Sequence, residues 1–162
     1  DTKVQDASQL IIQSFDWNKK NQPPEIHKDQ PPTELPKVVI KRDFFPPCIL
    51  NLLSGVKEDG RKRAIFVLIN FLRHMGWTYE SIESELLTWN KNNYEPLRDN
   101  YILAQVSWHK RQKSTFLPPN CTNQIYYNQS ECHKDPLCNK IKNPVQYVKK
   151  KIYLESKKKT KK

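Results

Sequence analysis

The stretch that decides the fold is GRKRAIFVLINFLRHMG, residues 60–76. Apolar side chains recur in it at the i, i+3, i+4, i+7 spacing of one helix face. They are Ile65, Leu68, Ile69 and Leu72, and Phe66 and Phe71 widen the stripe. Cationic side chains occupy the opposite face. The spacing predicts an amphipathic helix over residues 60–75, which ends at Gly76 and forms the centre of a helical domain.

Shorter helices are predicted on both sides of this stretch. Pro46 and Pro47 suit the first turn of a helix over residues 48–53, and Thr78 is a good N-cap for another. The further predicted helices cover residues 79–92, 96–112 and 144–154, whereas residues 117–142 show no regular pattern. The sequence therefore predicts an all-α fold, a helical bundle with an irregular, cysteine-bearing C-terminal segment.

Composition suggests one compact domain with polar extensions. The chain has 162 residues, of which 36% are hydrophobic, with 12 Pro and only 3 Gly. Residues 1–42 are expected to hold a short helix (4–15), a Pro-rich linker (18–37) and an extended arm or short strand (38–40). The domain is expected to span residues 43–154, with a basic, disordered tail at 155–162. Because the chain begins with Asp, we expect it to be a fragment or a processed product.

The charge favours an anionic partner. Lys and Arg number 28 against 17 Asp and Glu, a net charge of +11. Residues 140–162 hold ten Lys against the single acid Glu155. Such a segment attracts phosphates without sequence preference. The apolar runs are too short for a membrane span, and no signal-peptide pattern occurs. No Asp-x-Asp pair and no phosphate-binding GxxxxGK[ST] loop occurs either, so the chain is expected to bind rather than to catalyse.

Four cysteines form an even set with wide spacing: Cys48, Cys121, Cys132 and Cys138. Two disulfides are one interpretation, and sequons at Asn120 and Asn128 agree with it. A zinc site is the second, although zinc ligands usually come in close C-x2-C pairs, which are absent. The third is an iron–sulfur cluster, which cysteines from distant parts of a fold can bind. Spacing alone leaves all three open.

Cationic and aromatic side chains form three candidate sites for nucleotides or DNA. The first is the start of the 60–75 helix, where Arg61, Lys62 and Arg63 join free N–H groups and the positive end of the helix dipole. Arg73 lies at the other end of that helix, where with His74 it could instead complement the dipole. The second is the run Trp108, His109, Lys110 and Arg111, which suits single-strand binding. The third is Tyr126 and Tyr127, which could stack on bases or cover a metal cluster.

Several short motifs follow one another in a fixed order. They are FFPPCI (44–49), GRKRAIF (60–66), NFLR (70–73), GW (76–77), LPPNC (117–121), Cys132, DPLC (135–138) and IKNPVQY (141–147). Together they resemble the iron–sulfur domain of the large, non-catalytic subunit of archaeal and eukaryotic DNA primase, or a closely related primase-associated helical domain. The resemblance covers roughly residues 44–150.

The resemblance implies a function and a cofactor. All four cysteines would bind one [4Fe-4S] cluster. The domain would bind template DNA and the triphosphate of the initiating nucleotide, with Arg61 and then Arg63 as the leading contacts. Its partner would be a catalytic primase subunit or module, and its location intracellular. Two rival hypotheses are a zinc-stapled DNA-binding module without a priming role and a secreted, disulfide-bonded protein that binds polyanions.

Overall fold

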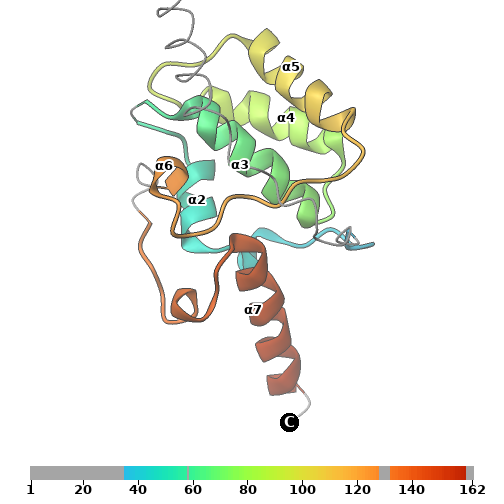
Figure 1. The fold of residues 1–162 in the computed structure, drawn as a ribbon, viewed down its shortest axis with the longest axis vertical. Helices are drawn as coiled ribbons and strands as arrows, with labels where there is room; N and C mark the ends of the chain where they lie inside the picture. Colours follow the sequence, from blue (N-terminus) through green and yellow to red (C-terminus); the bar gives the residue numbers. More distant parts are fainter. Residues whose placement is uncertain (1–34, 58, 128–131, 160–162) are drawn as a thin grey trace, which may run out of the picture. The chain divides into compact units, whose positions relative to one another are not determined.

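The computed structural model describes residues 35–57, 59–127 and 132–159, and within these ranges the chain forms helices and no strands (Figure 1). In chain order the helices are η1 (Arg42–Phe44), α2 (Pro47–Leu53), α3 (Arg61–His74), α4 (Tyr79–Asn90), α5 (Asp99–Lys110), α6 (Gln124–Tyr127), η3 (Cys138–Lys140) and α7 (Pro144–Lys159). The predicted all-α fold is confirmed. The helix predicted at residues 4–15 and most of the predicted linker lie outside the described residues.

Helix α3 is the centre of the domain, as its periodicity predicted. Nine of its 14 residues are buried, which is typical of a helix covered on several faces. Helices α2, α4 and α5 all pack against it. Phe45, just before α2, meets Phe71 edge to face with ring centroids 4.9 Å apart. The indole of Trp89 on α4 donates a 2.6 Å hydrogen bond to the carbonyl of Leu52, which joins α4 to α2.

The two ends of α4 show where local sequence decides the structure and where it does not. Thr78 caps α4 as predicted, because its hydroxyl accepts a 3.2 Å hydrogen bond from Ser81 N–H. The next helix was expected to start at Pro96, but α5 begins at Asp99. The buried Asn90 side chain pairs with both backbone groups of Leu97, at 2.7 and 2.8 Å. This pairing holds the chain extended up to residue 98, and no local pattern announces it.

The N-terminal arm, residues 35–41, forms neither a strand nor a helix and bends at Lys37 and Val38. The Ile40 N–H donates a 2.9 Å hydrogen bond to the Met75 carbonyl. The carbonyl of Val38 lies so close to Gly76 that a Cβ there would stand 2.8 Å from it. Gly76 also has a φ of 82°, so glycine is required at this turn on two grounds.

The last helix is longer than predicted. Helix α7 runs from Pro144 to Lys159, so five residues of the expected disordered tail are helical; residues 160–162 lie outside the described residues. Lysines in the last turn interact favourably with the negative end of the helix dipole. The Lys157 ammonium also lies 4.7 Å from the centroid of the Tyr153 ring. These contacts offset the self-repulsion on which the prediction of disorder rested. None of the described helices has the length and apolarity needed to cross a bilayer.

Candidate metal centre

The four cysteines, which lie far apart in the sequence, line one pocket. Cys48 is the second residue of α2, Cys138 opens η3, and Cys121 and Cys132 lie in the irregular segment. The pocket they share has a volume of about 590 Å³. Its remaining lining comes from Pro46, Thr122, Gln124, Tyr127, Lys134, Asn139 and Ile141. No disulfide joins the four cysteines. Among the described residues, however, no group of three or more Cys, His, Asp or Glu side chains is arranged so that it could hold a metal ion.

Backbone contacts hold the C-terminal segment in place around this pocket. The N–H of Cys121 donates a 2.8 Å hydrogen bond to the carbonyl of Lys142. The buried Asn143 side chain donates a 2.5 Å hydrogen bond to the carbonyl of Pro118. Residues shortly before Cys121 and after Cys138 are thereby fixed to each other. The segment without regular structure is therefore held by specific contacts beside two of the cysteines.

Asp135 orders the loop that carries Cys138. One carboxylate oxygen accepts hydrogen bonds from the N–H groups of Leu137 (2.9 Å) and Cys138 (3.1 Å). The other oxygen accepts a 2.5 Å hydrogen bond from the hydroxyl of Tyr147 on α7. Partial burial works to raise the pKa of Asp135, but these donors together hold it below its usual value. The sequence did not predict a role for Asp135 or Tyr147. An Asp that precedes a loop by two or three residues is nevertheless a recognisable signal, because its carboxylate can accept hydrogen bonds from the N–H groups of that turn.

The pocket disfavours the ionised, thiolate form of its cysteines. Burial raises the pKa of Cys48 far above its usual value, and the other three cysteines add to the shift. Burial, and then the charges of Cys138 and Cys132, raise the pKa of Cys121 to about 11. Burial also raises the pKa of Cys138. Several thiolates in such a pocket need a positive centre beside them, and a bound metal deprotonates its thiol ligands.

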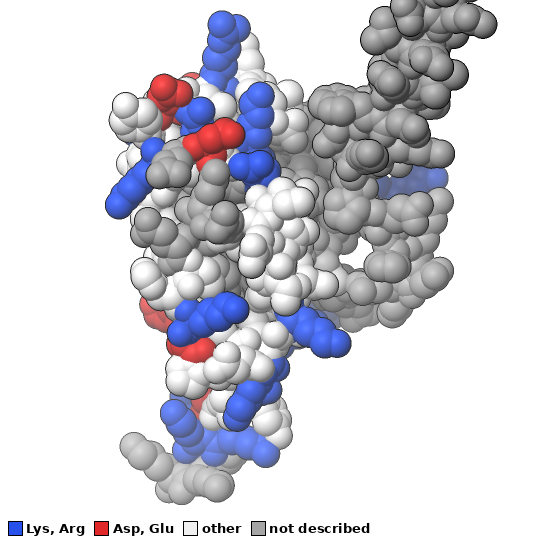
Figure 2. All heavy atoms as spheres, turned by 60° about the vertical axis from the view of Figure 1, so that its left-hand side comes forward, with Lys and Arg blue, Asp and Glu red and all other residues white. Residues whose placement is uncertain are grey.

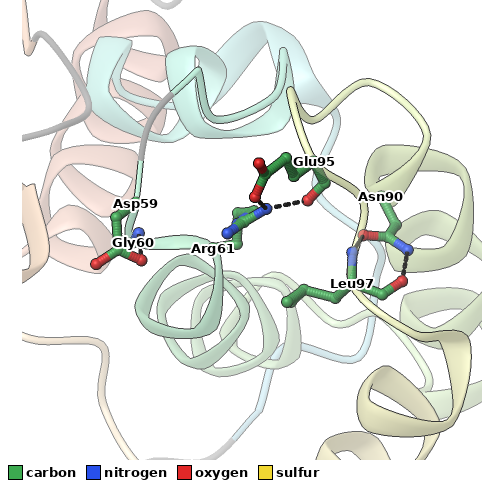
Figure 3. A network of polar contacts seen from close by, with 6 residues as sticks. All are labelled: Asp59, Gly60, Arg61, Asn90, Glu95 and Leu97. Atoms are coloured by element: carbon green, nitrogen blue, oxygen red, sulfur yellow. Dashed lines mark hydrogen bonds and ion pairs between the residues drawn. The ribbon is translucent and has the colours of Figure 1, made fainter.

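The three cations at the start of α3 have different surroundings. Arg61 donates to the Glu95 backbone carbonyl and lies 3.3 Å from the Glu95 carboxylate, and its side chain is only 18% exposed (Figure 3). The Lys62 ammonium lies 5.2 Å from the Tyr101 ring centroid. Arg63 is half-buried and forms no recorded hydrogen bond or ion pair with the described residues.

Arg61 therefore supports the loop between α4 and α5. Figure 3 shows it reaching toward Glu95, while Asn90 pairs with Leu97 a short way along the same loop. Asp59, also drawn there, accepts a hydrogen bond from the N–H of Gly60 at the start of α3. The sequence placed Arg61 first among the phosphate contacts, but the structure gives its guanidinium an internal partner. Arg63 is the freer of the two arginines.

Arg73 has an internal role as well. Its guanidinium donates a 2.6 Å hydrogen bond to the Trp77 carbonyl and lies 4.5 Å from the Tyr79 ring centroid. It thus fixes the turn between α3 and α4. His74, next to it, is buried, and burial lowers its pKa.

The predicted run from Trp108 to Arg111 divides into exposed and buried members. Trp108 is 42% exposed and stacks on Phe116, with ring centroids 5.9 Å apart. His109 is buried in the core, 2.8 Å from the Gln105 carbonyl, and burial lowers its pKa. This burial corrects its assignment as a surface contact. Lys110 forms a 2.8 Å ion pair with Glu80, and Arg111 is exposed.

The two adjacent tyrosines on α6 face different surroundings. Tyr127 is buried, lines the cysteine pocket and donates a 2.7 Å hydrogen bond to the Pro119 carbonyl. Tyr126 packs against Phe66 of α3, with ring centroids 5.7 Å apart. Tyr127 therefore covers the pocket, which is the alternative to base stacking that the sequence left open.

The fold and the pocket define a class: a small helical domain, centred on α3, in which four cysteines line one pocket. The chain is 32% identical over 126 residues to the DNA primase large subunit PriL of Methanosarcina barkeri (strain Fusaro / DSM 804). This alignment covers 75% of this chain and 29% of that protein. PriL of Methanosarcina mazei is 28% identical over 73% of this chain, and PriL of Thermococcus kodakarensis 27% over 74%. The aligned parts are 31% and 39% of those proteins, so this chain matches about a third of the length of its relatives. No family model and no solved structure matches it. The chain carries a domain related to the DNA primase large subunit PriL.

Proposed function

We propose that this domain is a non-catalytic part of a DNA primase, which binds template DNA and the triphosphate of the initiating nucleotide and supports primer synthesis by a separate catalytic subunit. The observation that carries the proposal is the pocket that gathers Cys48, Cys121, Cys132 and Cys138 from across the domain. The names of the three relatives support the same role.

The donor set fits an iron–sulfur cluster. Four thiolates suit either zinc or such a cluster. Zinc would need all four sulfurs at about 2.3 Å from one ion. The side chains of the described residues are not arranged to hold either group as they stand, so the thiols would have to move on binding. A cluster of several irons is larger than one ion, and the pocket of about 590 Å³ offers it room. When bound, it would supply the positive charge that keeps the thiolates ionised and would join α2 to the C-terminal segment.

Phosphate binding is assigned to the start of α3. Arg63 and Lys62 stand in the first turn of a 14-residue helix, where free N–H groups and the helix dipole favour anions. Arg61 stands at the same helix end, where its contact with Glu95 makes it a support for this site. Trp108 and Arg111 offer an exposed ring and a cation for a single strand.

Anaerobic purification tests the metal centre. We expect a brown protein that absorbs near 400 nm and contains iron and sulfide. Cys138→Ser should remove most of the colour, whereas Thr122→Ser, in the same pocket but without a thiol, should keep it. One zinc per chain and no colour would favour the zinc-stapled module. Cysteines joined in two disulfides would favour the polyanion-binding protein.

An initiation assay tests the nucleotide site. With the catalytic subunit supplied, Arg63→Ala should reduce synthesis of the first dinucleotide more than it reduces extension of a ready-made primer. Arg98→Ala, an exposed arginine outside this site, is the matched control. Equal loss of both activities in Arg63→Ala would contradict a role in binding the triphosphate.

A further inference from the structure

The second half of α7 is a basic helical segment that contacts the described domain only near its start, where Lys150 and Lys151 donate hydrogen bonds to Lys140 and Asp43. All the buried residues of α7 lie in its first five positions, from Pro144 to Val148. Residues 149–159, which we call the distal half of α7, include no buried side chain. In Figure 1 this part of the helix extends away from the other helices. Its surface is therefore open to a partner.

The distal half carries six lysines and one acid. The lysines are Lys149, Lys150, Lys151, Lys157, Lys158 and Lys159, and the acid is Glu155. In Figure 2 lysine or arginine side chains follow the protruding lower part of the molecule. Lys150 and Lys151 donate hydrogen bonds to the backbone carbonyls of Lys140 and Asp43. Lys149, Lys158 and Lys159 form no recorded hydrogen bond or ion pair with the described residues, so their charge is available.

The lysines surround the helix axis. At about 100° per residue, the two groups of three consecutive lysines each cover more than half of the circumference. A flat anionic surface, such as a membrane, could meet only one side of such a helix. Nor does a broad apolar stripe, which an interfacial helix needs, occur here: the large exposed apolar residues of the distal half are Ile152, Tyr153 and Leu154 alone.

A groove with phosphates on both walls matches this distribution. The major groove of B-form DNA is about 12 Å wide and admits an α-helix. Eleven helical residues extend about 16 Å, which corresponds to roughly five base pairs of duplex. Lys149 and Lys158, whose charges are available, lie about 180° apart around the helix axis, so each could reach one of the two backbones.

We propose that the distal half of α7 binds double-stranded DNA, lying along the major groove with its lysines on the phosphates of both strands. The contact is independent of sequence, because lysine–phosphate pairs position a protein without reading bases. This inference goes beyond the proposed function, since it requires neither the cysteine pocket nor the nucleotide site on α3. It adds a second, duplex-binding surface to the domain.

The salt dependence of DNA binding measures these contacts. Fluorescence anisotropy of the full chain on a 20-base-pair duplex, from 50 to 200 mM salt, gives the slope of log affinity against log salt. Lys158→Gln/Lys159→Gln should reduce that slope by about 1.8, since each lost phosphate contact is worth about 0.9. Lys37→Gln/Lys91→Gln, at exposed sites outside α7, is the charge-matched control and should leave the slope nearly unchanged. Glu155→Lys should raise both the affinity and the slope.

The outcomes separate the possible partners. An unchanged slope in the α7 variant, or an equal fall in the control, would overturn the proposal. Tighter binding to vesicles with anionic lipid than to the duplex would assign the helix to membranes instead. A single strand bound as tightly as the duplex, with the same loss in the α7 variant, would refute the groove. Circular dichroism checks that α7 stays helical in the Lys158→Gln/Lys159→Gln variant. If that variant loses helix, Glu155→Lys is the test, and a slope that does not rise in it would overturn the proposal. The anisotropy experiment contains neither nucleotide nor catalytic subunit. Its result is therefore independent of whether the proposed function in priming holds.

Discussion

Replacing Tyr147 by Phe removes one hydroxyl group and tests how the Cys138 loop is held. That hydroxyl donates a 2.5 Å hydrogen bond to the Asp135 carboxylate, and the Tyr147 ring is only 3% exposed. A hydrogen bond to a charged group contributes about 1.5–3 kcal/mol. Asp135 is half-buried, so water can partly replace the lost donor, and we expect a cost near the lower limit. This corresponds to a fall of about 5 °C in melting temperature for a domain of this size.

The assay is thermal unfolding of the full chain under anaerobic conditions. Tyr153→Phe is the matched control, because it makes the same change on the exposed part of the same helix. A double-mutant cycle with Asp135→Asn separates the direct contact from other effects of either change. Tyr147→Phe should also speed the loss of absorbance near 400 nm in air. A cycle in which the two changes add within about 0.3 kcal/mol would refute the claim that this contact holds the loop.

Three further predictions concern the helical core. Asn90→Ala should destabilise the domain by about 2 kcal/mol in urea unfolding, because both backbone groups of Leu97 lose their partner; a cost below about 0.5 kcal/mol would contradict this. Gly55→Ala should cost about 2 kcal/mol, since φ is 110° and the new Cβ would stand 2.6 Å from the carbonyl oxygen of Asn92; an unchanged melting temperature would show that the turn can rearrange. Burial lowers the pKa of His109, so the unfolded chain binds a proton that the folded chain does not, and stability should fall as the pH drops from 7 through about 6.5 toward 5. His109→Gln should flatten that fall, and an equally steep profile would exclude His109 as its source.

The sequence predicted the helices where one pattern dominates the neighbourhood. The apolar spacing around Ile65 and Leu68 gave α3 nearly to its ends, and Thr78 marked the start of α4. The start of α5 was missed because Asn90 fixes Leu97 through side-chain contacts that no local propensity records. The C-terminal end of α7 was missed because the charge pattern alone says nothing of the contact between Lys157 and Tyr153.

The candidate site was predictable in part. Wide spacing left the cysteines open to three interpretations, and only the family resemblance implied that they share one centre. The structure places all four in the lining of one pocket, and their binding of a metal there stays a prediction. The partners of the cations could not be read from the chain. The ion pair of Arg61 with Glu95 joins residues 34 positions apart, and the burial of His109 depends on the packing of α5 on α3.

The distribution of the pocket along the chain has a consequence for how the protein is made. Cys48 leaves the ribosome 90 residues before Cys138. Helices α2 to α5 are therefore synthesised, and can pack, before the last wall of the pocket exists. Under the proposed function, a metal delivered during translation would meet an incomplete set of thiols, so the centre would be loaded only at the end of biogenesis. A nascent chain halted before residue 138 should consequently remain metal-free even where its helical core has already formed.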